Sequence, residues 1–288
     1  MLRGARIGAP MGFDGYAPRS EPLISSSSLK RMAGTATYVY CIVQRSARPR
    51  VTRGPSGLGG ASIPRLVDIE KGLWMVCADV PLASYGAASI ERGLRDLDWV
   101  SRVAIAHEAV VERFTKVSGA TVIPMKLFTI FSNDERACEE MRSRRRDLGG
   151  IFRRIKGCQE WGVRITRRAL GLPQPQRSAP ASGSAFLAEK KRARDAVLQQ
   201  SQQVVRAADE TLRALGRLAR ETRRREPLEA ATTPPVLDAA FLVPVLRRAR
   251  FKSAATRAAS MCVDAGAELV LTGPWPAYHF IHSGDSAA

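Results

Sequence analysis

The sequence predicts an α+β protein built from two domains. The chain has 288 residues, 45% of them hydrophobic, which is enough to form two modest cores. Short β-branched and aromatic runs occur beside amphipathic helices, and the two do not alternate strictly enough for a doubly wound sheet. A stretch rich in Pro, Ser and Gly at residues 171–184 reads as a linker or mobile insertion.

The two ends of the chain are expected to lie outside the domains. Residues 1–36 are rich in Gly, Ser, Pro and Arg and show no sustained periodicity, which predicts a disordered extension. We also expect a disordered tail at residues 283–288. Between them we expect an N-terminal α+β domain at residues 37–157 and a C-terminal domain at residues 158–282.

Three apolar segments of the first domain predict strands. TYVYCIVQ at residues 37–44 has the β-branched and aromatic content of a strand. Residues 65–81 predict two short strands around the turn Lys71-Gly72. ATVIPMKL at residues 120–127 predicts a further strand, and Pro124 favours a sheet edge or a bulge for it.

Two helices are expected in the first domain. One begins at Asp98, which we expect to cap its first turn, and repeats apolar residues at steps of three and four. The other opens with a capping box formed by Ser132 and Glu135. Its apolar stripe keeps helical phase across Gly149-Gly150, so we expect the helix to continue to a stop at Gly157.

The second domain is expected to start with a half-buried strand. In EWGVRIT, residues 160–166, apolar side chains alternate with polar ones, which puts Glu160 on the polar face. The charged, proline-free residues 185–226 predict a long helix with a narrow apolar stripe, typical of a hairpin or coiled-coil arm. We expect the whole to form a modified ferredoxin-like sandwich with a long helical insertion. Its remaining elements are a strand at 239–243, a helix at 251–262 and strands at 268–272 and 278–281.

Composition limits the kinds of partner. The formal net charge of +18 suits an acidic partner such as nucleic acid, an anionic membrane face or an acidic protein. Five cysteines without a CxxC pair argue against a disulfide framework or a zinc site and favour a reducing cytoplasm. No apolar stretch approaches the roughly 20 residues of a membrane span, and no signal-peptide pattern opens the chain. We therefore expect a cytoplasmic protein that does not use a membrane.

No residue pattern predicts catalysis, a metal or a cofactor. His107, Glu108 and Glu112 lie together, but the second histidine of an HExxH zinc motif is missing, so we expect His107 to be structural. We expect the same of His279 and His282. Phosphate-binding loops and nucleophile elbows do not occur in this sequence. We therefore expect no catalytic residue, no metal and no cofactor.

Two arginine-rich runs are candidates for contact with an acidic partner. They leave open an alternative function, that of a basic nucleic-acid-associated protein. We favour solvated helix faces, because neither run comes with a nucleic-acid-binding motif or interleaved aromatic residues. The candidate basic surface comprises Arg142, Arg144, Arg145, Arg146, Arg153, Arg154, Arg223, Arg224 and Arg225.

The segment LTGPWPAYHFI, residues 271–281, combines two strand-like runs with a break between them. The prolines cannot donate backbone hydrogen bonds, and the glycine can take the unusual φ of a corner. We expect a rigid corner that fixes the tryptophan, with the two later aromatic residues on one face of a last strand. The favoured role is closing the core of the second domain, and the alternative is a partner contact. The residues concerned are Gly273, Pro274, Trp275, Pro276, Tyr278 and Phe280.

This segment closely resembles the C-terminal signature of the gas vesicle protein F/L family (GvpF/GvpL). Further segments resemble the family upstream, most of them in the expected order, and together they span residues 37–281. One departure is Leu127-Phe128, which stands where the family usually has a Phe-Gly pair, so the local turn is expected to differ. The similar segments are YVYCIV, VPLASYG, LDWVSRVAIAHEAVVERF, VIPMKL, GCQEWGVRI and SGSAFLAEKK.

The resemblance implies a fold of two α+β domains, the second of a modified ferredoxin type. It also implies a non-enzymatic accessory or minor structural protein of gas vesicles, located at the gas vesicle. The implied partners are the major gas vesicle shell protein and other gas vesicle accessory proteins. The implied role is to limit aggregation of the shell protein during nucleation.

Overall fold

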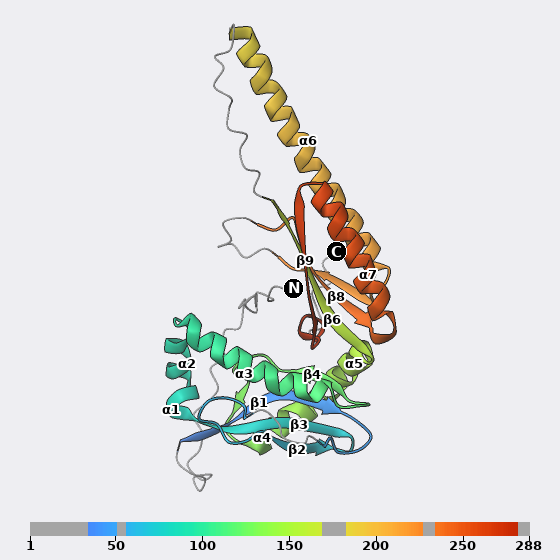
Figure 1. Ribbon diagram of the computed structural model, residues 1–288. Helices are drawn as coiled ribbons and strands as arrows, with labels where there is room; N and C mark the ends of the chain where they lie inside the picture. The colour runs from blue at the N-terminus through green and yellow to red at the C-terminus, as the bar shows by residue number, and fades with distance from the viewer. Residues whose placement is uncertain (1–33, 51–55, 169–182, 227–233, 282–288) are drawn as a thin grey trace. The chain divides into compact units, whose positions relative to one another are not determined.

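The computed structural model of the protein describes residues 34–50, 56–168, 183–226 and 234–281. The described residues form two units that mix helices and strands, so the α+β class is confirmed (Figure 1). One unit holds residues up to Lys156 together with those from Phe280 onward, and the other holds residues 157–279.

Part of the expected organisation lies outside the described residues. This applies to residues 1–33 and 283–288 of the expected disordered ends, to residues 171–182 of the expected linker, and to His282. Thr35 and Ala36, placed in the extension by the sequence, already belong to the first strand.

The described residues of the first unit form an antiparallel sheet of five strands: β1 Thr35–Gln44, β2 Arg65–Glu70, β3 Leu73–Pro81, β4 Thr121–Pro124 and β5 Ile130–Phe131. Their order is β2-β3-β1-β4, and β5 also pairs with β1. β1 is central and buries its inner residues from Ala36 to Val43. The turn at Lys71-Gly72 and the edge position of Pro124 are as predicted.

In the described part of this unit five helices accompany the sheet: α1 Leu82–Tyr85, α2 Ala87–Gly93, α3 Leu97–Thr115, α4 Asp134–Ser143 and α5 Arg145–Ile155. The predicted cap of α3 is wrong by two residues, because the carboxylate of Asp96 accepts the backbone N–H groups of Asp98 and Trp99 at 2.9 and 3.1 Å. The predicted capping box is also wrong. Asn133 caps α4 by accepting the N–H of Arg136 at 2.8 Å.

The second helix of the first unit is interrupted at a different place than its glycines suggest. The interruption falls at Arg144, between α4 and α5, and both glycines lie inside α5. Arginines on either side of it bind β2, since Arg142 Nε donates to Ile69 O at 3.0 Å and Arg145 pairs with Glu70 at 3.1 Å.

A buried polar cluster joins α3 to β1. His107 is 2% exposed, and its Nδ1 lies 2.8 Å from the hydroxyl oxygen of Tyr38. The ring of Tyr40 packs against the same imidazole, with centroids 5.5 Å apart. Burial raises the pKa of Tyr40 to about 12 and lowers that of His107 to about 4, although the Met125 backbone partly opposes the second shift.

The second unit contains the strands β6 Cys158–Arg167, β7 Glu221–Arg224, β8 Leu237–Pro244 and β9 Ala267–Trp275 and the helices α6 Gly183–Gly216 and α7 Arg248–Asp264. A short η1 Val245–Arg247 precedes α7, and η2 Tyr278–Phe280 follows β9. The antiparallel sheet has the order β7-β8-β6-β9. Apart from the two short 3₁₀ turns, the described part of this unit therefore follows a strand–helix–strand–strand–helix–strand sequence.

The long helix is shorter than the predicted residues 185–226. It ends at Gly216, because the backbone then turns and pairs with β8, starting with Arg220 N donating to Leu242 O at 2.7 Å. α6 is also no insertion into the unit. It is the first of the two α-helices that the described residues of this unit form, and it packs beside α7 (Figure 1).

One face of the second sheet is apolar and is covered by α6 and α7. Trp161 and Phe241 project from neighbouring strands, and both rings meet Phe251 of α7, at centroid distances of 6.0 and 5.5 Å. Val204 and Leu215 of α6 are buried in the same core. The opposite face carries Glu160 of β6, Arg223 of β7 and Asp238 of β8, and it supplies the site described below.

We expect acid to destabilise the first unit through His107. Burial lowers the pKa of its imidazole from 6.5 to about 4, so the unfolded chain takes up a proton first as the pH falls. The stability that neutral His107 provides is complete above pH 6.5 and is lost between pH 6.5 and about 4. The loss should reach up to about 3 kcal/mol. Urea unfolding at several pH values measures it.

His107→Gln is the control for this prediction, because an amide can still bond to the Tyr38 hydroxyl but does not titrate. Its free energy of unfolding should depend less on pH than that of the parent protein. Identical pH profiles for the two proteins would mean that carboxylates, and not this histidine, dominate the acid response.

Candidate interaction site

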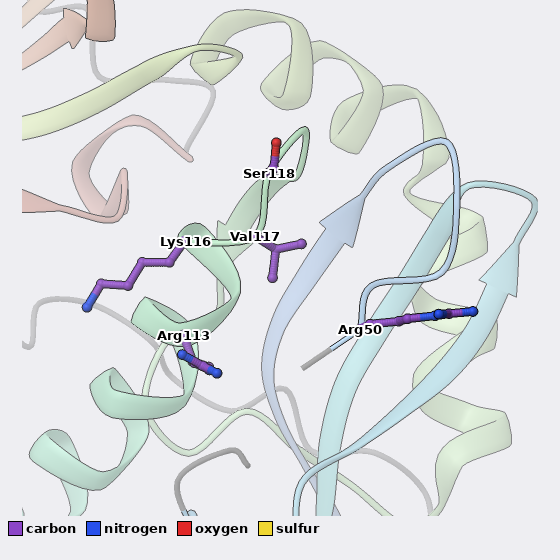
Figure 2. Close-up of a pocket in the computed structure, with 5 residues that line it drawn as sticks. All are labelled: Arg50, Arg113, Lys116, Val117 and Ser118. Carbon is purple, nitrogen blue, oxygen red and sulfur yellow. The ribbon is translucent and has the colours of Figure 1, made fainter. Parts of the chain in front are cut away.

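One hollow on the described surface of the first unit does not form a convergent site for a small molecule. A hollow of about 210 Å³ is lined by residues near the end of α3 and by Arg50 (Figure 2). Figure 2 shows the charged ends of Lys116 and Arg50 pointing in opposite directions. Lys116 is paired with Glu112 at 2.8 Å. The cations around the hollow therefore do not gather on one point where an anion could bind.

The histidine and glutamates that were considered as a possible metal site do not form one group in the structure. His107 is bonded inside the first unit, while Glu112 is on the surface and holds Lys116. Among the described residues, no group of three His, Cys, Asp or Glu side chains could hold a metal ion. Burial raises the pKa of the Cys77 thiol to about 12 and raises that of Cys41 as well, so neither is an activated nucleophile.

The proline-containing break is a bulge within β9, and the strand does not end there. Glu160 of β6 pairs with Trp275, and Gly162 pairs with Thr272. Two residues of β9, Gly273 and Pro274, therefore stand opposite the single intervening residue of β6. This is the two-against-one count of a β-bulge.

Gly273 is required at the bulge for two reasons. Its φ is +114°, and an added Cβ would lie 2.8 Å from the carbonyl oxygen of Glu160 and 3.3 Å from Cδ1 of Trp275. Its peptide bond to Pro274 is cis. The predicted corner is thus found at the predicted residue, although β9 passes through it.

Trp275 is 44% exposed, so the prediction that it closes the core is wrong. It lies opposite Glu160, and directly opposite residues share a face of a sheet, so its side chain is on the face away from α6 and α7. β9 is an edge strand of the sheet formed by the described residues, and its Val270 is also 44% exposed. The edge and these two side chains form a surface that a partner can reach.

The predicted last strand, residues 278–281, is also wrong. Tyr278–Phe280 form the 3₁₀ turn η2, so the two aromatic residues do not share a strand face. Phe280 and Pro276 are buried, which removes them from the candidate contact residues. Of the predicted corner residues, Gly273 and Pro274 shape the bulge and Trp275 is the large exposed side chain.

Glu160 holds both ends of the segment that follows the bulge. Its backbone pairs with Trp275, while its carboxylate accepts the backbone N–H of His279 at 2.9 Å and lies 2.5 Å from His279 Nδ1. Glu160 lies on the polar face of β6 as predicted, yet it is only 3% exposed. Arg223 Nη1 also donates to the carbonyl oxygen of His279 at 2.8 Å.

These holding residues carry no signal in the sequence. Glu160 sits in an alternating pattern that correctly assigns it to the polar face, but the pattern does not say what covers that face. Its partner His279 is 119 positions away. Only the register of β6 with β9 brings the two together.

The second arginine run is used within the fold. Arg225 pairs with Asp238 at 2.6 Å, and Arg164 donates to the same carboxylate at 2.7 Å. An added Cβ at Gly162 would lie 3.0 Å from Arg225 Nη2, so this glycine makes room for the guanidinium.

The other two arginines of the second run also have carboxylate partners. Arg223 pairs with Glu221 at 2.8 Å, and Arg224 with Asp209 at 3.4 Å.

The first arginine run is divided between structural and exposed side chains. Arg142 and Arg145 bind β2, and Arg154 is partly buried. Arg144, Arg146 and Arg153 are exposed. Arg142 and Arg145 are exposed as well, but both contact β2, so we keep these three as the candidates of the run for an acidic partner. The two runs belong to different units.

Comparison with known proteins gives consistent matches over nearly the whole chain. The family model described as gas vesicle synthesis protein GvpL/GvpF matches residues 36–282. Gas vesicle protein L of Streptomyces sp. (strain CB03234) is 28% identical over 253 aligned positions, and the match covers 84% of this chain and 91% of that protein.

Two solved structures share the fold. The crystal structure of the gas vesicle protein GvpF from Anabaena sp. PCC7120 aligns with a TM-score of 0.62 at 16% identity and covers 87% of this chain and 98% of that one. GvpF from Microcystis aeruginosa aligns with a TM-score of 0.59 at 15% identity, over 86% of this chain and 99% of that one.

Removing the carboxylate of Glu160 should release the segment that carries Trp275. Glu160→Ala leaves the two hydrogen-bonding groups of His279 without their buried acceptor, which should cost about 2 kcal/mol. Hydrogen exchange should become faster at residues 276–279, and chemical denaturation should report the loss of stability.

Asp209→Ala is the matched control, because it removes a carboxylate of the same unit whose pair with Arg224 is exposed. Such a pair contributes about 0–1 kcal/mol. If both variants lose the same stability and residues 276–279 stay protected, Glu160 does not hold this segment.

Proposed function

Because this chain belongs to the gas vesicle GvpL/GvpF family, we propose that it binds the major gas vesicle shell protein through the β9 edge and Trp275. In this proposal it is an accessory or minor structural protein without enzymatic activity, located at the gas vesicle in the cytoplasm. It limits aggregation of shell subunits during nucleation and also contacts other gas vesicle accessory proteins. Among the described residues, no helix is long and apolar enough to cross a membrane.

The observation that carries this proposal is an exposed tryptophan on an edge strand. Trp275 and Val270 are each 44% exposed along β9. An edge strand offers unpaired backbone groups, and an extended partner segment can add to it as a further strand. A large aromatic side chain beside such an edge is the type of residue that contributes most to binding.

The proposed partner chemistry follows from the problem that shell subunits pose. A small hydrophobic subunit with free strand edges aggregates before it is assembled. A protein that pairs with one edge blocks this route while it stays bound. Binding has to be reversible, so a short edge with few anchoring side chains suits the role better than a large apolar interface.

Trp275→Ala should separate binding from folding. Because the side chain is 44% exposed, we expect a stability loss of about 1 kcal/mol or less, but a loss of about 2 kcal/mol in shell-protein affinity. The affinity can be measured by biolayer interferometry with shell protein fused to a solubility domain, and the stability by chemical denaturation.

Leu246→Ala is the matched control, since Leu246 is an apolar residue of the same unit and is 99% exposed. It should change neither quantity. If the Trp275 variant binds shell protein with normal affinity, this tryptophan does not belong to the interface. If the variant loses much stability, the tryptophan has a structural role.

The dependence of shell-protein affinity on salt concentration should test whether the exposed arginines contribute to binding. If Arg144, Arg146 and Arg153 contact an acidic surface of the shell protein, affinity should fall as salt rises, because screening acts beyond about 8 Å at physiological ionic strength. Affinity that is independent of salt would indicate apolar docking alone. A mobility-shift assay with duplex DNA should accompany the salt titration. Tight DNA binding without shell-protein binding would favour a nucleic-acid-associated function.

A further inference from the structure

The N-terminal half of α6 extends past the body of its unit. At Gln200 the helix passes Gly266, where an added Cβ would lie 2.4 Å from Gln200 Nε2. At Ser201 it meets the end of β6, since Arg167 Nη2 donates to Ser201 Oγ at 3.0 Å. Residues 183–198 lie beyond both points, and we call them the α6 arm (Figure 1). About 16 residues of helix are roughly 24 Å long.

The side of α6 that is buried in the body continues along the arm as an exposed apolar row. Phe186 and Val197 lie within about 20° of Val204 around the helix axis, at 100° per residue. Val204 is 1% exposed, whereas Val197 is 60% and Phe186 50% exposed. The residues of this row are therefore apolar throughout, but they are buried in the body of the unit and exposed on the arm.

A second apolar row runs beside the first. Leu187, Leu198 and Val205 each directly follow a member of the first row, so they lie about 100° further round the helix. They are 67%, 55% and 44% exposed. Together the rows form a face with exposed apolar residues along both of its sides, wider than the narrow stripe predicted from the sequence. An exposed face of this kind marks an interaction surface.

Two cations stand in the middle of this face. Lys190 and Arg194 are four residues apart, and both lie between the two rows around the helix axis. The apolar pair Phe186 and Leu187 precedes them, and Val197 with Leu198 follows them. Within the described part of the chain neither cation has an ion-pair partner, and both are exposed. The arm thus presents an apolar pair, a cation pair and a second apolar pair in sequence.

We propose that the α6 arm is a second docking surface, whose partner is an amphipathic helix with carboxylates between its apolar residues. Such a helix can cover both apolar pairs and place its carboxylates on Lys190 and Arg194. A second copy of this chain fits poorly. The cations lie near the centre of the arm, so parallel or antiparallel pairing of two arms brings cation against cation.

The proposal can be tested with two designed peptide probes. Both are helices of about 18 residues with two leucine pairs, separated in one by a glutamate pair and in the other by a lysine pair. Fluorescence anisotropy should show the glutamate probe binding the full chain at least tenfold more tightly than the lysine probe.

Arg194→Glu and Arg192→Glu form a matched pair of variants. They change the charge equally within one turn, but position 192 is on the side of the helix away from the apolar face. Arg194→Glu should weaken binding of the glutamate probe at least tenfold, and Arg192→Glu less than twofold. Val197→Asp should weaken binding of both probes. Circular dichroism confirms that each variant keeps its helix.

Three outcomes would overturn the proposal. They are absence of binding by the glutamate probe, equal loss in the two arginine variants, and self-association of the chain that Val197→Asp abolishes. This docking does not depend on the β9 edge, so Trp275→Ala should leave probe binding unchanged. Failure at the arm can therefore be told apart from failure of shell-protein binding at β9.

Discussion

The exposed position of Trp275 depends on one buried carboxylate. Glu160 is 3% exposed, and a carboxylate in such a place requires hydrogen-bond donors. His279 supplies two, through its backbone N–H and its ring. Since the backbone of Glu160 also pairs with Trp275, both ends of a short segment are attached to one residue. The chain between them must curve back, which is why a 3₁₀ turn forms where the aromatic sequence suggests a strand.

Periodicity predicts most of the longer elements of the fold, but it does not predict where they end. The central strand, the hairpin at Lys71-Gly72 and the edge strand at Pro124 follow from residue types that act locally. Helix ends depend on which of two neighbouring polar residues reaches the free N–H groups, and Asp96 competes successfully with Asp98. The end of α6 depends on pairing with β8, a contact that is distant in sequence. Local propensity cannot contain such information.

One departure from the family pattern has a structural counterpart. Phe128, which stands where the family usually has glycine, adopts a φ of +63°. That conformation is uncommon for a residue with a side chain and costs about 1–3 kcal/mol. The ring of Phe128 stacks on Trp99 at a centroid distance of 5.5 Å and an angle of 3°, and such contacts offset part of this cost. The turn keeps the backbone of a glycine turn, so the expected difference lies in the side chain.

The candidate site could be predicted only in part. As for the fold, the residue types predict local backbone features but not contacts between residues that are distant in the sequence. Gly273 and Pro274 predict a distortion of the backbone. Only glycine tolerates a φ near +114° so close to the carbonyl group of Glu160. Whether Trp275 then points into the core depends on the register of β9 with β6, which the sequence does not reveal. Likewise, a run of arginines does not show that Arg223, Arg224 and Arg225 already have carboxylate partners.

Both proposed surfaces expose apolar side chains, and each carries a feature that opposes self-association. On β9, Pro274 has no N–H to offer a second edge, and the bulge interrupts the regular register that edge-to-edge pairing needs. On the α6 arm, Lys190 and Arg194 repel an identical arm, and the net charge of +18 acts in the same direction for the whole chain. These features do not oppose every partner equally. A short strand that stops before the bulge can still pair with β9, and a helix with carboxylates is attracted to the arm. Protection against self-association and selection of a different partner therefore arise from the same residues.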